Sequence, residues 1–112
     1  MNIPNQDFTI DHNSKLPLHV QVEELFRKLI QMEVYKKALQ FGVKVYKLTL
    51  TNQQIAKDFG LKDQLQRAVL SISNNIAEGF ERETKKELIH FLYISKGSAG
   101  ECRNMFNFLQ ML

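Results

Sequence analysis

Tryptophan is absent, cysteine occurs once and proline twice in these 112 residues. The lone cysteine, Cys102, excludes an internal disulfide, and we expect it to act as a small apolar side chain on a helix. Both prolines, Pro4 and Pro17, precede residue 18, so the rest of the chain is free to form long helices. No apolar run approaches the roughly 18 residues of a membrane span, and the polar N-terminus is no signal peptide. We therefore expect a cytoplasmic protein that does not insert into membranes.

The composition, 44% hydrophobic and 24% charged, is that of one small soluble domain with an appendage. The formal charge of +3 is distributed unevenly. Residues 1–32 hold three basic against four acidic residues, so the positive charge belongs to the remainder of the chain. Such a balance permits contact with nucleic acid without requiring it.

Apolar spacing of three and four residues predicts helices along most of the chain. Residues 1–18 read as a flexible arm, 19–31 as an appended amphipathic helix and 32–112 as a helical bundle domain. The stripe of 19–31 and the stripe that begins at Val34 point about a third of a turn apart, which predicts a bend near residues 31–33. Within the domain we expect helices over 32–50, 62–81 and 85–112, with a short helix over 55–59 that Gly60 ends.

The link between the last two helices is a short polar break. Thr84-Lys85-Lys86-Glu87 is a capping box, in which Thr84 accepts from the third backbone amide and Glu87 reaches back. A tight turn here makes the two flanking helices antiparallel. The predicted fold is all-α, an antiparallel up-down helical bundle.

No set of residues has the spacing of a catalytic or metal site. The three histidines lie far apart in the sequence, at His12, His19 and His90, without metal-ligand spacing. Gly97-Ser98-Ala99-Gly100 is a weak phosphate-loop signal, and we interpret it as a mark of close helix approach. Glu78 and Glu101 are the carboxylates near an apolar face, but an acid/base pair there is a minor hypothesis. We expect no enzyme activity, no cofactor, no metal and no small-molecule substrate.

Polar residues adjoin the apolar face of the helix over 62–81. Ser71, Asn75 and Glu78 share one side, beside Ile72 and Ile76. Polar groups next to a core cost free energy unless they are hydrogen-bonded. Two interpretations stay open: they bond to the neighbouring helix and set packing register, or they line a polar groove or subunit contact.

Basic residues form two sets that we take as candidate nucleic-acid ligands. The first set lies opposite the apolar stripe of the helix over 32–50 and comprises Lys36, Lys37, Lys44 and Lys47. The second set is near the last turn and comprises Lys62, Arg67, Arg82, Lys85 and Lys86. A solvated helix face often carries such charges, but repetition around a symmetric assembly would concentrate them against phosphates.

A competing pattern covers residues 51–69. Thr51-x-x-x-Ile55-Ala56-x-x-x-Gly60-Leu61 is similar to the turn of helix-turn-helix DNA-binding proteins. Upstream, residues 16–22 look like the start of winged-helix regulators of the GntR type, but the wing strands are absent. A small DNA-binding regulator is therefore a rival hypothesis.

From about Met32 onward, the sequence resembles the bacterial four-helix-bundle proteins known as 23S rRNA-intervening sequence proteins. The similarity includes Val34-Tyr35-x-Lys37-Ala38, Tyr46-Lys47-Leu48-Thr49 and Gly60-Leu61-x-Asp63-Gln64-Leu65-x-Arg67-Ala68. Its most specific block is Ser71-Ile72-Ser73-x-Asn75-Ile76-Ala77-Glu78-Gly79, in which Asn75, Glu78 and Gly79 are motif and packing residues. Further blocks are Lys85-Lys86-Glu87-Leu88-x-x-Phe91-Leu92 and Gly97-Ser98-x-x-Glu101.

The resemblance implies an up-down four-helix bundle, often a homopentamer, without catalytic residues or cofactor. It also implies a link to ribosomal RNA genes, and a related branch acts with the reverse transcriptase of diversity-generating retroelements. Relative to that pattern the chain stops in or after the third helix and carries an extra N-terminal segment. Our hypothesis is that helix 19–31 docks into part of the space of the absent helix, against the seam at Leu92, Ala99, Phe106 and Leu109.

Three hypotheses follow. The first is a non-enzymatic oligomeric bundle that binds RNA or a nucleoprotein partner through basic surfaces. The second is a structural remnant without a specific ligand. The third is the helix-turn-helix-like DNA-binding regulator.

Overall fold

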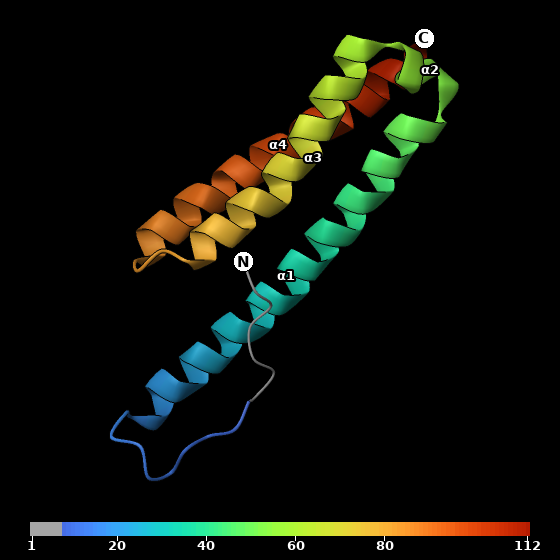
Figure 1. Cartoon of the computed structure of the whole chain (residues 1–112). Coiled ribbons are helices and arrows are strands. Elements are labelled where there is room, and N and C mark those ends of the chain that lie inside the picture. The colour runs from blue at the N-terminus through green and yellow to red at the C-terminus, as the bar shows by residue number, and fades with distance from the viewer. Residues whose placement is uncertain (1–7) are drawn as a thin grey trace.

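The computed structural model describes residues 8–112, which form helices joined by short connections (Figure 1). The helices are α1 (Leu18–Thr51), α2 (Gln53–Lys57), α3 (Phe59–Phe80) and α4 (Lys85–Met111). Residues 8–112 contain no strand, so the predicted all-α class is confirmed. The first seven residues of the predicted arm lie outside the described part of the chain.

Helix α1 is a single helix of 34 residues, and the bend predicted near residues 31–33 is wrong. Gln31, Met32 and Glu33 are good helix formers, and no glycine or proline interrupts them. Two apolar stripes on different sides require a bend only if both must contact the same neighbour. The first turns of α1 project past the other helices, so the stripe of residues 19–31 is not drawn toward them (Figure 1).

Short polar side chains begin the three later helices. Asn52 accepts from the Ile55 amide at 3.1 Å, Asp58 from the Leu61 amide at 3.1 Å, and Thr84 from the Glu87 amide at 3.2 Å. Each satisfies an amide that has no partner within its helix. Because Asp58 starts α3 at Phe59, Gly60 lies in the first turn of α3 and does not end the preceding helix as predicted.

Helix α3 lies between α1 and α4 and is antiparallel to both (Figure 1). Among the described residues, the backbone of α1 approaches those of α2 and α3 but not that of α4. The two contact faces of α3 are therefore different sides of one helix. The result is an elongated molecule of 60 × 25 × 20 Å in which α1 and α4 flank a central helix.

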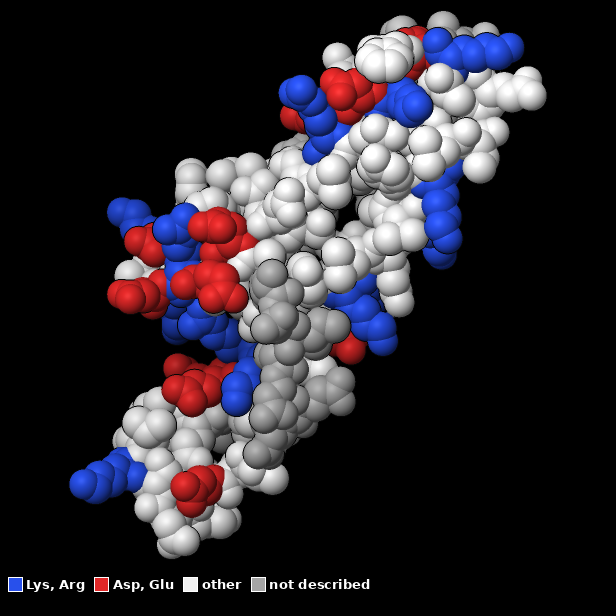
Figure 2. All heavy atoms as spheres, viewed as in Figure 1, with Lys and Arg blue, Asp and Glu red and all other residues white. Residues whose placement is uncertain are grey.

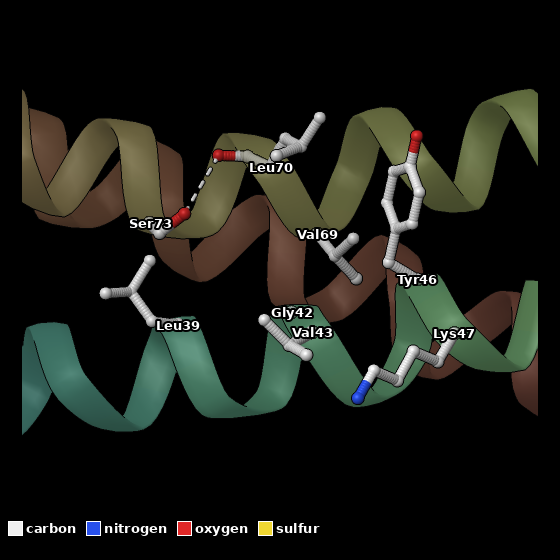
Figure 3. A pocket seen from close by; sticks show the side chains of 8 residues that line it. All are labelled: Leu39, Gly42, Val43, Tyr46, Lys47, Val69, Leu70 and Ser73. Atoms are coloured by element: carbon white, nitrogen blue, oxygen red, sulfur yellow. Dashed lines mark hydrogen bonds between the residues drawn. The ribbon is translucent and has the colours of Figure 1, made fainter.

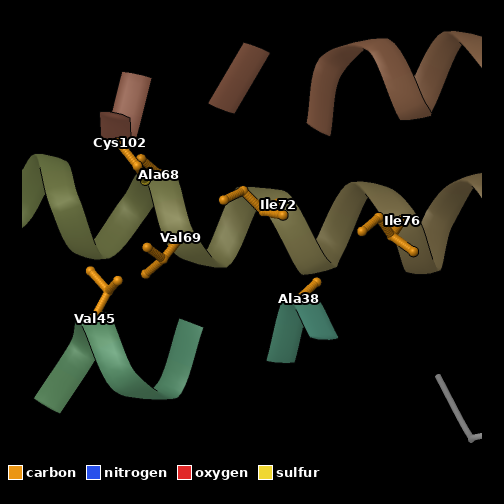
Figure 4. Packing of buried hydrophobic residues seen from close by; sticks show 7 residues of the cluster. All are labelled: Ala38, Val45, Ala68, Val69, Ile72, Ile76 and Cys102. Atoms are coloured by element: carbon orange, nitrogen blue, oxygen red, sulfur yellow. The ribbon is translucent and has the colours of Figure 1, made fainter. Parts of the chain in front are cut away.

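The core runs along α3, where apolar residues at helical spacing meet both neighbours (Figure 4). Leu65 and Val69 are the deepest apolar side chains of α3, with 0% and 1% exposure. Val69, Ala68, Ile72 and Ile76 of α3 form one buried cluster with Ala38 and Val45 of α1 and Cys102 of α4. Burial of such side chains contributes about 1.5–3 kcal/mol each, which makes α3 the centre of stability.

The hypothesis that residues 19–31 dock beside α4 is wrong, because α1 continues straight and its backbone does not approach α4 within residues 8–112. Arg27 instead reaches the end of α3. Its Nη2 donates to the carbonyl oxygens of Phe80 at 3.3 Å and Arg82 at 3.2 Å. These bonds hold α1 against the end of the hairpin formed by α3 and α4.

Candidate nucleic-acid interface

The second half of α1 presents a surface of one charge sign. Residues 34–57 contain five lysines and no aspartate or glutamate. Four of the lysines, the first predicted set, are exposed on α1, at positions 36, 37, 44 and 47. At about 100° per residue they point away from the buried Ala38 and Val45, and at 1.5 Å per residue they span about 16 Å. We call these four residues the lysine face.

The second predicted set does not join the lysine face. Arg67 is paired with Asp63 at 3.2 Å, and Arg82 is paired with Glu78. Lys85 and Lys86 belong to a turn in which glutamates alternate with basic residues, at positions 81, 83 and 87. Figure 2 shows blue and red side chains interleaved around this turn. Lys62 lies half-buried near the start of α3. These five cations therefore give a locally neutralised surface.

The guanidinium of Arg82 has a further contact. Its Cζ lies 4.8 Å from the centre of the Phe91 ring, a cation–π distance. The same side chain pairs with Glu78, and its carbonyl oxygen accepts from Arg27. Arg82 thus links all three long helices and is engaged within the fold.

The polar motif of α3 is hydrogen-bonded within the seam between α3 and α4. The Asn75 amide donates to the carbonyl oxygen of Ser71 at 2.7 Å and to its hydroxyl at 2.9 Å. Ser98 of α4 donates to the same hydroxyl at 2.8 Å, and Ser95 donates to the carbonyl oxygen of Ile72 at 2.9 Å. Glu78 points outward to its pair with Arg82. Small hydroxyl side chains thereby join the two helices where bulky residues would separate them.

Close helix approach occurs at Gly79 and not at the glycines of α4. A Cβ atom added at Gly79 would lie 3.0 Å from the Cβ of Phe91 and 3.3 Å from the carbonyl oxygen of Leu88. At Gly97 it would meet nothing within 4 Å, and at Gly100 only the tip of Arg103 at 3.8 Å. Within residues 97–100 the two glycines therefore do not mark the close approach, whereas the buried Ser98 does, through its hydrogen bond to the Ser71 hydroxyl of α3.

The buried thiol of Cys102 is 1% exposed, as expected of a small core side chain. Burial, and secondly the adjacent Glu101 carboxylate, raise the pKa of the Cys102 thiol. A thiol held in its protonated form is a poor nucleophile.

A shallow apolar pocket of about 330 Å³ lies between α1 and α3, at the edge of the lysine face (Figure 3). Leu39, Val43, Val69 and Leu70 form its apolar wall, and Tyr46 and Lys47 stand at one end. Tyr46 is 40% exposed. Tyr46 and Lys47 are neighbours in the chain, and their side chains extend in different directions from α1 in Figure 3. Nucleic-acid surfaces combine exposed aromatic rings for stacking with basic residues for phosphate contact. Tyr46 was not among the candidate ligands named from the sequence.

Residues 51–69 do not form the unit that the helix-turn-helix pattern suggests. Helix α2 has five residues, and only Asp58 separates it from α3. A recognition helix must offer one face to the DNA groove, whereas α3 is packed between α1 and α4.

Among the described helices, none is long and apolar enough to cross a membrane.

The fold and surface define a class: a small antiparallel helical protein with a central buried helix and one basic outer helix face. The chain belongs to the 23S rRNA-intervening sequence protein family, whose model matches residues 30–112. The first turns of α1 precede the matched region. Comparisons with curated proteins and with solved structures found no match.

Proposed function

We propose that this chain is a non-enzymatic, oligomeric RNA-binding protein that contacts the phosphate backbone of structured RNA through the lysine face. The observation that carries the proposal is the acid-free run of residues 34–57, four of whose five lysines share the outer side of α1. The family description, which refers to ribosomal RNA, supports RNA as the nucleic acid.

The geometry suits a duplex or hairpin stem. A duplex carries about one charge per 1.7 Å of axis, so a 16 Å face lies opposite about ten phosphate charges. Four lysines can each displace a counterion there, and the ring of Tyr46 adds an apolar contact at one edge. Recognition of this kind depends on backbone charge and shape and not on base identity.

A single lysine face binds weakly at physiological salt, because four phosphate contacts supply only a modest counterion-release term. Several copies in one particle would raise the effective affinity without any new contact. Oligomerisation is therefore part of the proposal, in the cytoplasmic setting where RNA is available.

The test is a salt titration of binding to an RNA hairpin and to a DNA duplex of the same sequence, followed by fluorescence anisotropy. We expect the logarithm of the affinity to fall with the logarithm of salt concentration with a slope of about −3 per protomer engaged. K44E/K47E should lower the affinity at low salt at least about tenfold and reduce the slope by about 2.

The matched control is K85E/K86E, which makes the same charge change in the mixed turn and should alter the affinity less than about threefold. Equal losses in both double variants would overturn the assignment to α1. Absence of salt-dependent binding in the wild type would favour a remnant without a ligand. Sequence-selective binding to the DNA duplex alone would favour a DNA-binding regulator.

A further inference from the structure

Gly42 is a glycine in the interior of α1 that the packing of this chain does not require. A Cβ atom added there would lie 3.8 Å from the carbonyl oxygen of Val69, which is an ordinary van der Waals contact. Glycine inside a helix nevertheless destabilises the helix relative to alanine. Gly42 lines the shallow apolar pocket between α1 and α3, so its missing side chain preserves the volume of that pocket.

The two ends of this pocket are formed by side chains from one side of α1. Leu39 and Tyr46 are seven residues apart, so they share a side of the helix and are separated by about 10.5 Å along its axis. In Figure 3 the Leu39 side chain points toward α3 at one end, and the Tyr46 ring rises toward α3 at the other. Val69 of α3 lies between them. The pocket is therefore apolar and has an exposed aromatic ring at one end.

The dimensions of the pocket suit one planar group of the size of a nucleobase. A volume of about 330 Å³ is at the lower end of the range for small-ligand sites, about 300–1,000 Å³. A base has a thickness of about 3.4 Å, the spacing of stacked bases in a strand. It therefore fits beside the Tyr46 ring within the length of the pocket. A peptide helix, with a diameter of about 10 Å, is too wide to enter.

The lining of the pocket favours contact with the face of a base over contact with its edge. Leu39, Val43 and Leu70 present only carbon atoms from their side chains. The Ser73 hydroxyl donates to the carbonyl oxygen of Leu70 at 3.4 Å, and Ser73 is only 8% exposed. Because every base has a π-face, stacking on Tyr46 tolerates any base.

The pocket opens beside the lysine face. Lys47 lines the pocket, belongs to the lysine face and is one helical turn from Val43. Lys36 precedes Lys47 by eleven residues, which places both on nearly the same side of α1, about 16 Å apart. In Figure 3 the Lys47 side chain extends along α1 and not toward α3. A strand whose phosphates contact these two lysines therefore passes the opening of the pocket.

We infer that the pocket receives one unpaired base of the RNA that binds the lysine face, an inference that rests on the proposed function. The base stacks on the Tyr46 ring in the space that Gly42 leaves free, and a neighbouring phosphate contacts Lys47. Proteins stack unpaired bases of RNA loops and bulges on aromatic side chains, whereas the bases of a paired stem stay inside the duplex. The preferred ligand is thus a stem interrupted by an unpaired nucleotide.

The test compares two RNA hairpins with the same stem, one fully paired and one with a single unpaired adenosine within the stem. Fluorescence anisotropy measures the affinity of the full chain for each. The wild type should bind the bulged hairpin at least about fivefold more tightly, which is the lower limit for stacking of one base on an aromatic side chain. The ratio of the two affinities should stay constant as salt concentration rises, because stacking releases no counterions.

Tyr46→Ala should remove this preference: the affinity for the bulged hairpin falls at least about fivefold and that for the paired hairpin less than about twofold. Tyr46→Phe keeps the ring and should keep the preference. Phe41→Ala is the matched control, because Phe41 also lies on α1, is 42% exposed and does not line the pocket. It removes no stacked base, so both affinities should stay within about twofold of the wild type.

Gly42→Ala separates the pocket from the stability of the fold. The added methyl group should raise the urea midpoint of unfolding, because alanine favours a helix and its Cβ meets no close contact. The same group occupies part of the pocket, so the preference for the bulged hairpin should fall at least about twofold. A Gly42→Ala protein that keeps the full preference would overturn the inference.

The remaining outcomes distinguish this inference from the proposed function. Equal, salt-dependent binding of the two hairpins by the wild type would overturn the inference, leave the proposed function in place and assign the pocket to an apolar protein contact. Equal losses in Tyr46→Ala and Phe41→Ala would overturn the inference as well, as would a preference that Tyr46→Ala retains. Absence of binding to both hairpins would overturn the proposed function and the inference together.

Discussion

Helices α1 and α3 are both long, yet they differ in how many of their residues are buried. Helix α3 buries seven of its 22 residues, whereas α1 buries three of 34. Many apolar positions of α3 are therefore constrained by packing against a neighbour on one side or the other, although Phe59 and Leu70 stay exposed. The sequence of α1 is constrained mainly along the side that faces α3, which leaves its other sides free to carry the lysine face.

This difference indicates which residues can be substituted without a large loss in the free energy of unfolding. Substitutions on α3 act on the free energy of unfolding, because the side chains removed there leave cavities or unpaired groups. Substitutions on the outer sides of α1 act on association, because the groups removed there contact solvent. The predictions below test this division, from the largest expected effect to the smallest.

Leu65→Ala should lower the free energy of unfolding by about 2–5 kcal/mol, since Leu65 is fully buried and its truncation leaves a cavity. Ile30→Ala on an exposed side of α1 should cost less than about 1 kcal/mol, because the Ile30 side chain is 51% exposed. Urea denaturation at dilute protein concentration measures both. A similar cost for the two variants would contradict the division between α3 and α1.

Gly79→Ala should destabilise the fold by about 1–2 kcal/mol, although alanine favours a helix by about 1 kcal/mol over glycine. The added Cβ would collide with the Cβ of Phe91 at 3.0 Å, and neither atom is on a flexible tip. Gly97→Ala is the matched control: its Cβ enters open space, so it should stabilise by about 0.5–1 kcal/mol. Thermal and urea unfolding should move in opposite directions for the two variants, and a shared direction would place the close approach elsewhere.

The smallest effect concerns pH. The raised pKa of the Cys102 thiol means that the unfolded chain loses this proton first, at its ordinary value of 9.0. The contribution of the buried thiol is therefore complete below pH 9 and is lost as pH rises through the folded pKa. Cys102→Ala should cost about 1 kcal/mol at pH 7, and the gap to the wild type should narrow above pH 9. Denaturation under reducing conditions at pH 7 and pH 10 measures the free energy of unfolding of both proteins. A difference between them that widens as pH rises would contradict the predicted pH dependence.

Much of the fold was predictable from local pattern. The stripe through Leu65, Val69, Ile72 and Ile76 marks the buried side of α3, and the Thr84 cap marks the start of α4. Both signals are local: one is the periodicity of side chains, and the other is a hydrogen bond between residues three positions apart. They depend on no knowledge of what lies opposite.

The predictions that failed concern which helices pack against each other, because the sequence pattern does not specify this. Gly97 is small enough for close approach, but among the described residues an added Cβ there would meet nothing within 4 Å, whereas at Gly79 it would meet the Cβ of Phe91 at 3.0 Å. A bend near residues 31–33 was expected because two stripes diverge, yet α1 stays straight because the described helices do not draw the stripe of residues 19–31 toward them. A stripe shows that a face is apolar and not which element covers it.

The candidate interface was predicted in part. The four lysines of α1 stand together on one exposed side, while the second basic set lies among carboxylates. The distinguishing signal, a run of residues 34–57 without acids, is readable in the sequence. Net charge summed over a large segment hides it.

The most direct test of the central claim, that the lysine face of α1 is where RNA binds while α3 holds the fold together, is amide hydrogen exchange with and without a structured RNA hairpin. In the free protein the amides of residues 65–76 should exchange only through global unfolding, more slowly than those of residues 18–33. Added RNA should slow exchange along residues 34–48 and leave the turn at residues 81–87 unchanged. Protection that appears at the turn, or on no part of α1, would contradict the account.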